Sequence, residues 1–255
     1  LRPADGIVSN GSGPGVCRGG IEWRGVLYRV LGSKFCSVAA DGTVVEIGDV
    51  GEGDSVTFTY GFDRLAIVSN NNLFYWDEAL LTQVTDSDLG VVLDAVWVDG
   101  YFMTTDGEFL VVTELNDPTS VLPAKYGSSE SDPDPVVAVK RVRNEVYAVN
   151  RYSIEAFSNV GGNGFPFARI EGAKVTKGAV GTHAVCVYIE ALAFVGSGYN
   201  EAPGVYLGIN AQAQKISTVE VDRLLASSTE QQPSQTASAP RHHNNAQHLY
   251  THHVP

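Results

Sequence analysis

Sulfur-containing residues are scarce in this chain, which has three cysteines and one methionine among 255 residues. Cys17, Cys36 and Cys186 form an odd and widely spaced set, which excludes a framework of disulfides. We therefore expect reduced, buried thiols and a chain that can fold in a cytoplasm.

Long apolar runs and sorting signals are lacking as well. No run approaches the roughly 18 apolar residues of a membrane-spanning helix, and no secretory signal peptide opens the sequence. The first residue is Leu1 rather than methionine, so we expect the start of the natural chain to be missing.

Basic residues are outnumbered, with 17 lysines and arginines against 29 aspartates and glutamates, and the formal net charge is -12. A protein that grips nucleic acid nonspecifically usually presents a basic face. This balance argues against a general DNA-binding surface, while a local basic patch stays compatible with it.

Helix signals are few. Residues 218–227 are the one good candidate, with Thr218 as the cap and Val219, Leu224 and Leu225 facing inward. By contrast, 27 glycines and 11 prolines are spread along the chain, which is typical of many short strands joined by turns. The length and the 44% hydrophobic content allow one large β domain with a sizeable core.

A unit of strands recurs five times, at a spacing of about 35 to 45 residues. The first strands are expected at residues 21–23, 56–60, 93–98, 136–142 and 183–189. The second strands are expected at residues 26–30, 65–69, 101–105, 146–150 and 192–196. The third strands are expected at residues 35–38, 73–76, 109–113, 154–157 and 205–209. This spacing predicts an all-β fold, a β-propeller-like array of four-stranded blades with at least five repeats.

No catalytic set is recognisable. A serine or cysteine nucleophile needs a histidine base, and His183, the one histidine inside the repeats, starts an apolar strand. Cys186 lies in the same strand, where a reactive thiolate is not expected. Paired carboxylates could serve a glycosidase, but Asp86, Asp88 and Asp94 occupy a segment with turn character, so we interpret them as structural.

Cofactor and metal motifs are also missing. The alternating glycines at residues 11–15 are not followed by the lysine and hydroxyl residue of a phosphate loop, and no acidic loop has the ligand order of an EF-hand. The histidines near the end could bind Zn²⁺ or Ni²⁺, which we interpret as adventitious binding; they are His242, His243, His248, His252 and His253. We expect no cofactor and no metal.

A glycine-rich turn in residues 161–164 joins two extended runs, 154–157 and 165–170. Its glycines are Gly161, Gly162 and Gly164. They allow a sharp reversal, because glycine adopts positive φ without a steric penalty. Phe165 and Phe167 flank Pro166, so both rings are predicted on one face of a strand whose proline lies at an edge or bulge.

Aromatic and acidic residues suggest packing and contact positions. We expect inter-blade core at Trp23, Trp76 and Trp97, each in a predicted strand. Residues 125–135 are expected to form a polar loop that protrudes between the third and fourth blades, since two Asp-Pro steps oppose helix and central strand. The candidate contacts with other subunits or partners are Tyr126, Asp132, Asp134 and Tyr199.

Four ordered segments of the sequence carry a family resemblance. They are RGGIEWRGVLYRVLGSKF at residues 18–35, VGEGDSVTFTYGFDRLAIVSNNNLFYW at residues 50–76, the glycine hairpin at residues 152–181, and PGVYLGINAQAQKIST at residues 203–218. Over residues 16–228 the chain resembles the packaged-DNA stabilisation proteins, or tail-hub proteins, of short-tailed bacteriophages. The resemblance lies in structural segments rather than in a catalytic signature.

The resemblance implies a structural virion protein, assembled in the host cytoplasm. It would prolong the channel of the portal–adaptor ring, retain packaged double-stranded DNA, and form the platform for the tail needle or plug and the tailspikes. A homo-hexameric ring is the implied assembly, with no catalysis and no membrane. DNA would pass through without sequence-specific binding.

The expected organisation has three parts. Residues 1–15 form an N-terminal loop segment, residues 16–228 the propeller, and residues 229–255 a polar, histidine-rich tail that is disordered or aberrant. Because the sequence no longer resembles the family after residue 228, we expect the propeller to be incomplete at its C-terminal end.

Two other hypotheses remain open. A propeller that binds or hydrolyses a host-surface glycan would need clustered carboxylates or aromatic platforms at one end. An interaction scaffold unrelated to phages would need neither.

Overall fold

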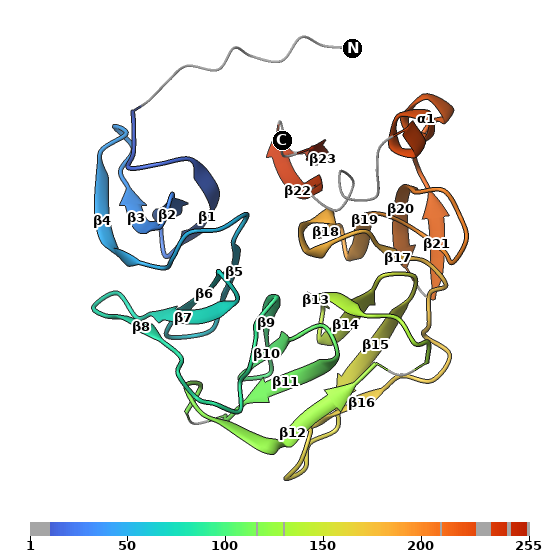
Figure 1. The fold of residues 1–255 in the computed structure, drawn as a ribbon, viewed down its shortest axis with the longest axis horizontal. Helices are drawn as coiled ribbons and strands as arrows, with labels where there is room; N and C mark the ends of the chain where they lie inside the picture. Colours follow the sequence, from blue (N-terminus) through green and yellow to red (C-terminus); the bar gives the residue numbers. More distant parts are fainter. Residues whose placement is uncertain are drawn as a thin grey trace. The chain divides into compact units, whose positions relative to one another are not determined.

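The computed structural model describes residues 11–115, 117–129, 131–209, 211–227, 236–243 and 246–253 (Figure 1). For the last two ranges and for residue 209 the description is limited to the backbone. The chain divides into two compact units, Leu1–Gln83 and Val84–Pro255.

The first unit contains two antiparallel sheets of four strands, each in sequence order. The first sheet is β1 (Cys17–Trp23), β2 (Val26–Leu31), β3 (Lys34–Val38) and β4 (Val44–Asp49). The second sheet is β5 (Thr57–Tyr60), β6 (Leu65–Ser69), β7 (Asn72–Trp76) and β8 (Leu81–Gln83). Each sheet is a meander of hairpins, so short turns alone fix the order of its strands.

The second unit contains three further sheets. The third sheet is β9 (Asp94–Val98), β10 (Tyr101–Thr105), β11 (Phe109–Thr113) and β12 (Val121–Ser128). The fourth is β13 (Val136–Val142), β14 (Glu145–Asn150), β15 (Ile154–Asn159) and β16 (Phe167–Arg169). The fifth contains β17 (Gly178–Ala179), β18 (Val185–Tyr188), β19 (Ala191–Ser197), β20 (Gly204–Ile209) and β21 (Gln212–Lys215), with both β17 and β18 paired to β19.

Within the second unit the first strands of the third and fourth sheets, β9 and β13, lie side by side, and β13 also lies beside β18 of the fifth sheet (Figure 1). A last hairpin, β22 (Thr236–His243) and β23 (Ala246–His253), continues this series, because β22 lies along β18. Serial four-stranded sheets with adjacent first strands are the arrangement of propeller blades. The prediction of an all-β, propeller-like array of at least five blades is confirmed.

Apolar side chains fill the spaces between neighbouring sheets. In the first unit Trp23, Tyr28 and Phe35 of one sheet share a buried cluster with Leu65 and Ile67 of the next. In the second unit one cluster joins the third and fourth sheets and another joins the fourth and fifth. Burial of this surface is the main favourable term in folding, at about 25 cal/mol per Å².

The predicted tryptophan positions differ in burial. Trp23 is 4% exposed, and Trp76 is partly buried against the same cluster. Trp97 is half-buried, and the guanidinium of Arg141, from the next sheet, lies 5.3 Å from its ring centroid. A cation therefore covers Trp97 where we predicted apolar core.

The predicted hairpin at the glycine cluster is confirmed. β15 and β16 pair in antiparallel register, and Phe165 and Phe167 both pack on the cluster between the third and fourth sheets. Pro166 accepts a hydrogen bond from the N–H of Val160 through its carbonyl and lies just before β16. The missing N–H of Pro166 therefore removes no hydrogen bond between β15 and β16.

Two expectations about strand and loop boundaries were wrong. The polar loop does not begin at residue 125, because β12 continues to Ser128 and pairs with β11. The strand expected at residues 183–189 is β18 and begins at Val185, since residues Thr182–Ala184 form a turn of 3-10 helix. Residues 229–255, expected to be a disordered or aberrant tail, include the paired backbones of β22 and β23.

The predicted helix is present as α1 (Val219–Ser227), but its inward face was predicted wrongly. The first backbone hydrogen bond of the helix runs from the N–H of Asp222 to the carbonyl of Thr218. Val219 and Leu224 are 60% and 69% exposed, and only Leu225 packs on a buried cluster. No helix in the described part of the chain has the length and apolarity to cross a membrane.

Gly162 supplies a test of the hairpin turn. Its φ is +118°, a conformation that a β-branched residue adopts only with strain. We expect Gly162→Val to lower the free energy of unfolding by about 1–3 kcal/mol in urea denaturation. Gly164→Ala is the matched control, because an added Cβ there would meet only the carbonyl oxygen of Ala124 at 3.5 Å. Equal stability of the two variants would contradict a turn that needs positive φ.

Candidate functional site

The loop between β12 and β13 lines a surface pocket of about 560 Å³ in the second unit. The lining comes from three stretches: Gly107, Glu108 and Phe109 after β10, Ser128 and Ser129 at the end of β12, and Asp132 to Pro135 before β13. The N–H of Val136 donates to the carbonyl of Gly107 and so ties the two sides together.

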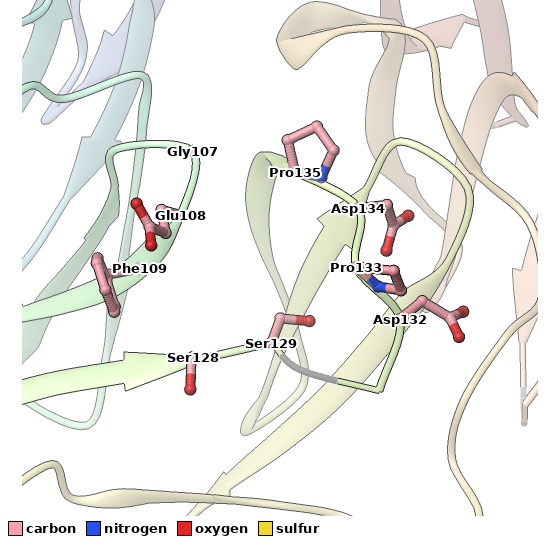
Figure 2. Close-up of a pocket in the computed structure, with 9 residues that line it drawn as sticks. All are labelled: Gly107, Glu108, Phe109, Ser128, Ser129, Asp132, Pro133, Asp134 and Pro135. Carbon is pink, nitrogen blue, oxygen red and sulfur yellow. The ribbon is translucent and has the colours of Figure 1, made fainter.

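The acidic side chains of this pocket do not converge on a reacting centre. Figure 2 shows Glu108 on one side and Asp132 and Asp134 on the other, with the carboxyl groups of the two aspartates pointing away from Glu108. General acid–base catalysis by two carboxylates requires both to face one bond. This arrangement therefore gives no support to a glycosidase, and the aspartates act within the loop instead.

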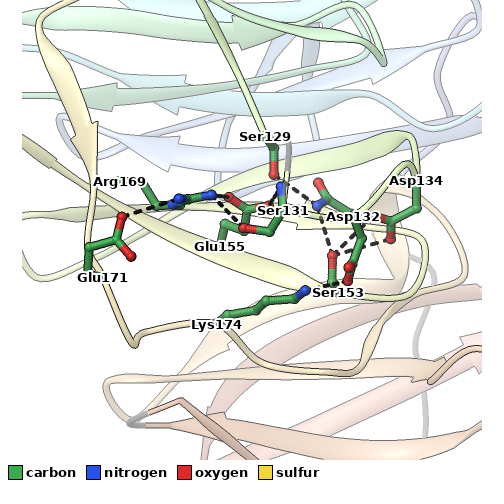
Figure 3. Close-up of polar contacts among 10 residues, drawn as sticks. Ser129, Ser131, Asp132, Asp134, Ser153, Glu155, Arg169, Glu171 and Lys174 are labelled. Atoms are coloured by element: carbon green, nitrogen blue, oxygen red, sulfur yellow. Dashed lines mark hydrogen bonds and ion pairs between the residues drawn. The ribbon is translucent and has the colours of Figure 1, made fainter.

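Asp134 holds the loop against the turn between β14 and β15 (Figure 3). Its carboxylate accepts hydrogen bonds from the N–H of Tyr152 at 2.7 Å and from the hydroxyl of Ser153 at 3.1 Å. Asn150, fully buried, donates through Nδ2 to the hydroxyls of Ser129 and Ser153. The loop is thus fixed by buried polar contacts rather than by apolar packing.

A second group of contacts fixes the start of the loop (Figure 3). Glu155, the second residue of β15 and 1% exposed, accepts from the N–H of Ser131 at 2.9 Å. Arg169 of β16 donates to the hydroxyl of Ser131, and its guanidinium lies 3.7 Å from Glu155 and 3.2 Å from Glu171. The cation offsets part of the cost of burying the Glu155 carboxylate, whose Oε2 it faces without a hydrogen bond.

Asp132 is attached more loosely. It forms an ion pair with Lys174 at 2.7 Å, and its side chain is 42% exposed. Such surface pairs contribute about 0–1 kcal/mol. Of the two predicted aspartates, Asp134 is therefore the structural anchor and Asp132 the one that keeps contact with solvent.

The two predicted tyrosines have different surroundings. Tyr126 lies in β12 rather than in a loop; its hydroxyl donates to the carbonyl of Asp88, and its ring packs edge-on against Phe109. Tyr199 lies in the loop between β19 and β20, is 75% exposed, and contacts Tyr152 with ring centroids 5.3 Å apart. Only Tyr199 presents an open aromatic surface of the kind that anchors protein interfaces.

Two of the three carboxylates considered for catalysis, Asp86 and Asp94, have structural partners. Asp86 accepts from the N–H groups of Asp88 and Val121. Asp94, fully buried, accepts from the N–H of Val139 at 2.9 Å and from the ammonium of Lys140 at 2.6 Å. The latter contacts link β9 to β13, so Asp94 joins two sheets instead of serving chemistry.

The remaining candidates have no catalytic arrangement either. His183 lies in the 3-10 turn before β18. Burial raises the pKa of the Cys186 thiol to about 11, so the thiolate is not populated near neutral pH. Among the residues that the structure describes, no three His, Cys, Asp or Glu side chains gather as a metal site. The side chains of the five C-terminal histidines lie outside that description.

Sequence reasoning missed the charged residues that are buried or partly buried, such as Glu155 and Arg18. Arg18 donates to the carbonyls of Gly32, Gly51 and Asp54 and to the hydroxyl of Ser69, which joins both sheets of the first unit. Burial lowers the pKa of its guanidinium from the usual value. The only sign in the sequence that Glu155 is buried was its position between apolar residues of a strand. The sequence does not show which residue would pair with its carboxylate.

These observations define a class of protein: a β-propeller-like array whose described polar clusters fix loops and join sheets. The matching family model is described as "Bacteriophage P22 Gp10, beta-propeller" and covers residues 1–254. The chain belongs to this family, as the resemblance predicted.

A curated relative agrees with this family. The tail hub protein gp10 of Salmonella phage P22 is 26% identical over 250 residues, which are 90% of this chain and 51% of that protein. The chain therefore spans about half the length of the curated relative that it matches.

Solved structures support the fold alone. The WD40 domain of Neurospora crassa Pan2 matches with a TM-score of 0.54 at 10% identity, over 79% of this chain and 65% of that one. YjhT matches with a TM-score of 0.51 at 12% identity, over 78% and 82% of the two chains. The extracellular domain of BT4673 from B. thetaiotaomicron matches with a TM-score of 0.53 at 12% identity, over 80% of this chain and 28% of that one.

The loop anchor can be tested with two aspartates of the same loop. Asp134→Ala leaves the N–H of Tyr152 without its acceptor, and we expect it to cost about 1–3 kcal/mol of unfolding free energy in urea. Asp132→Ala removes only a surface ion pair and is expected to cost less than about 1 kcal/mol. Equal losses would show that Asp134 is no anchor.

Thiol reactivity gives an independent test of the buried cysteines. Cys17 is exposed, whereas Cys36 and Cys186 are buried and burial raises the pKa of both thiols. We expect iodoacetamide to alkylate Cys17 in the native protein and the other two only after denaturation, as measured by mass spectrometry of peptides. Rapid native labelling of Cys186 would revive the possibility of a reactive thiol.

Proposed function

We propose that this chain is a structural part of a phage tail hub that prolongs the portal–adaptor channel and retains packaged DNA in the capsid. The observation that carries the proposal is the family match over residues 1–254. The relative at 26% identity is named a tail hub protein.

The geometry of the described residues supports a mechanical role. Their buried polar groups join strands and loops, as Asp94 joins β9 to β13 and Asp134 fixes the loop after β12. Such links stabilise one arrangement of neighbouring sheets, because breaking one leaves a buried charge or donor unpaired. A channel component under pressure from packaged DNA needs this resistance to distortion.

The net charge supports a channel through which DNA passes, rather than one that retains DNA by binding it. A wall with a net negative charge repels phosphates, whereas a basic wall would bind them by releasing counterions. The formal net charge of -12 fits a conduit along which DNA slides during ejection. Retention would then rely on closure by a plug or needle.

Assembly as a homo-hexameric ring completes the proposal. The ring would contact the portal–adaptor complex on one side and the tail needle or plug and the tailspikes on the other. Among the candidate contact residues, Tyr199 is the best supported, since it is 75% exposed and rests on Tyr152. Asp132 is the second, while Tyr126 and Asp134 would act through the loop that they position.

Assembly is tested by cosedimentation of the purified protein with portal–adaptor complexes. We expect binding with ring stoichiometry, and Tyr199→Ala should weaken it about tenfold or more if this tyrosine is an interface anchor. Tyr60→Ala, at another exposed tyrosine (53%), is the matched control. A monomer that ignores portal complexes would overturn the proposed function, and equal effects of both substitutions would remove Tyr199 from the interface.

DNA affinity tests the conduit separately. We expect no shift of linear double-stranded DNA by the purified protein at low ionic strength, where electrostatic attraction is strongest. Binding that weakens steeply with added salt would instead reveal a basic surface, and the sliding model would fail.

A further inference from the structure

The tip of the β15–β16 hairpin contains an asparagine followed by glycine, Asn163 and Gly164. This dipeptide is chemically labile, because the unshielded backbone nitrogen of the glycine can attack the side-chain amide of the asparagine. Folded structure usually suppresses the attack by holding either group in hydrogen bonds. Whether the step proceeds is therefore decided by the structure around it.

Neither reacting group is held at this tip. Asn163 is exposed, and within the described residues neither its side-chain amide nor the N–H of Gly164 makes a hydrogen bond. The preceding residues give room for rearrangement, since a Cβ added at Gly161 or Gly162 would meet no atom within 4 Å. The backbone of the tip can thus reach the geometry of attack.

Asn159 of the same hairpin provides an internal comparison. Its side chain donates to Asp99 and accepts from the N–H of Gly161. The residue that follows it is Val160, whose N–H donates to the carbonyl of Pro166 at 2.8 Å. Both reacting groups are engaged there, and a β-branched side chain shields the nitrogen.

We propose that Asn163 is a site of spontaneous deamidation in the folded protein, with water as the only co-reactant. The N–H of Gly164 loses its proton and its nitrogen bonds to Cγ of Asn163; the Cγ–Nδ2 bond breaks and ammonia leaves. Water then opens the cyclic imide at either carbonyl, which leaves aspartate or isoaspartate. Asparagine and water are consumed, and an acidic residue and ammonia are formed.

The products alter the hairpin tip in two ways. Each adds a negative charge, and isoaspartate also inserts one carbon into the backbone. Phe165 follows directly and packs against Gly127 of β12, where an added Cβ would overlap its ring. Aged molecules therefore differ from new ones at the point where the fourth sheet covers the third.

The test follows the tryptic peptide 152–169, which contains both asparagines, after incubation of the intact protein at mildly alkaline pH. Mass spectrometry with fragmentation that separates aspartate from isoaspartate locates the change. We expect modification at Asn163 and none at Asn159, at a rate within about fivefold of the same peptide made synthetically, since the fold gives no protection. A rate more than about fivefold slower in the folded protein would overturn the proposal.

Gly164→Ala is the variant that tests the mechanism, and circular dichroism checks that it folds. The new Cβ makes only an ordinary contact with the Ala124 carbonyl, so the hairpin is retained. We expect deamidation to slow about tenfold or more, because the side chain shields the attacking nitrogen. An unchanged rate would rule out attack by this nitrogen.

Discussion

Each sheet of this protein can hide an apolar face only against another sheet. A single four-stranded meander has no core of its own, so Phe35 of β3 is fully buried only because residues of β5, β6 and β7 lie against it. The same dependence joins the third, fourth and fifth sheets through their two clusters. Contact between facing sheets is therefore the interaction that every other feature presupposes.

Hydrogen bonds and ion pairs of buried or partly buried charged side chains add direction to this packing. Apolar contact does not depend on direction. The contacts of Arg18 in the first unit, and of Asp94 with Lys140 in the second, form only when the sheets that carry these residues are in one relative position. A buried ion pair such as that of Asp94 with Lys140 adds little net stability, because desolvation offsets the attraction. Its effect is to penalise arrangements in which a charge would lose its partner, which suits a component whose proposed role is to keep its shape.

The loops divide into anchored and open types. The loop after β12 is fixed by Asp134 and by Ser131 on Glu155, so Asp134, one of the carboxylates that line the pocket, serves to hold the loop. The β15–β16 tip is open, with Asn163 exposed at its end. Positions of the second type, including Tyr199, remain available to partners or to solvent chemistry.

The sequence by itself determined the local structure and the class of fold. Strands such as β6, β10, β11 and β13 lie where β-branched and apolar residues predict them, because strand propensity and turn chemistry act over a few residues. The family resemblance was likewise readable, since it lies in ordered segments. Tertiary structure alone decided which charges are buried and whom they meet: Asp94 and Lys140 lie 46 residues apart, and Glu155 depends on Arg169 of the next strand. It also decided that Val219 and Leu224 face solvent and that the Tyr126 hydroxyl is bonded to the carbonyl of Asp88, because burial and contacts depend on the neighbouring elements and no local pattern contains that information.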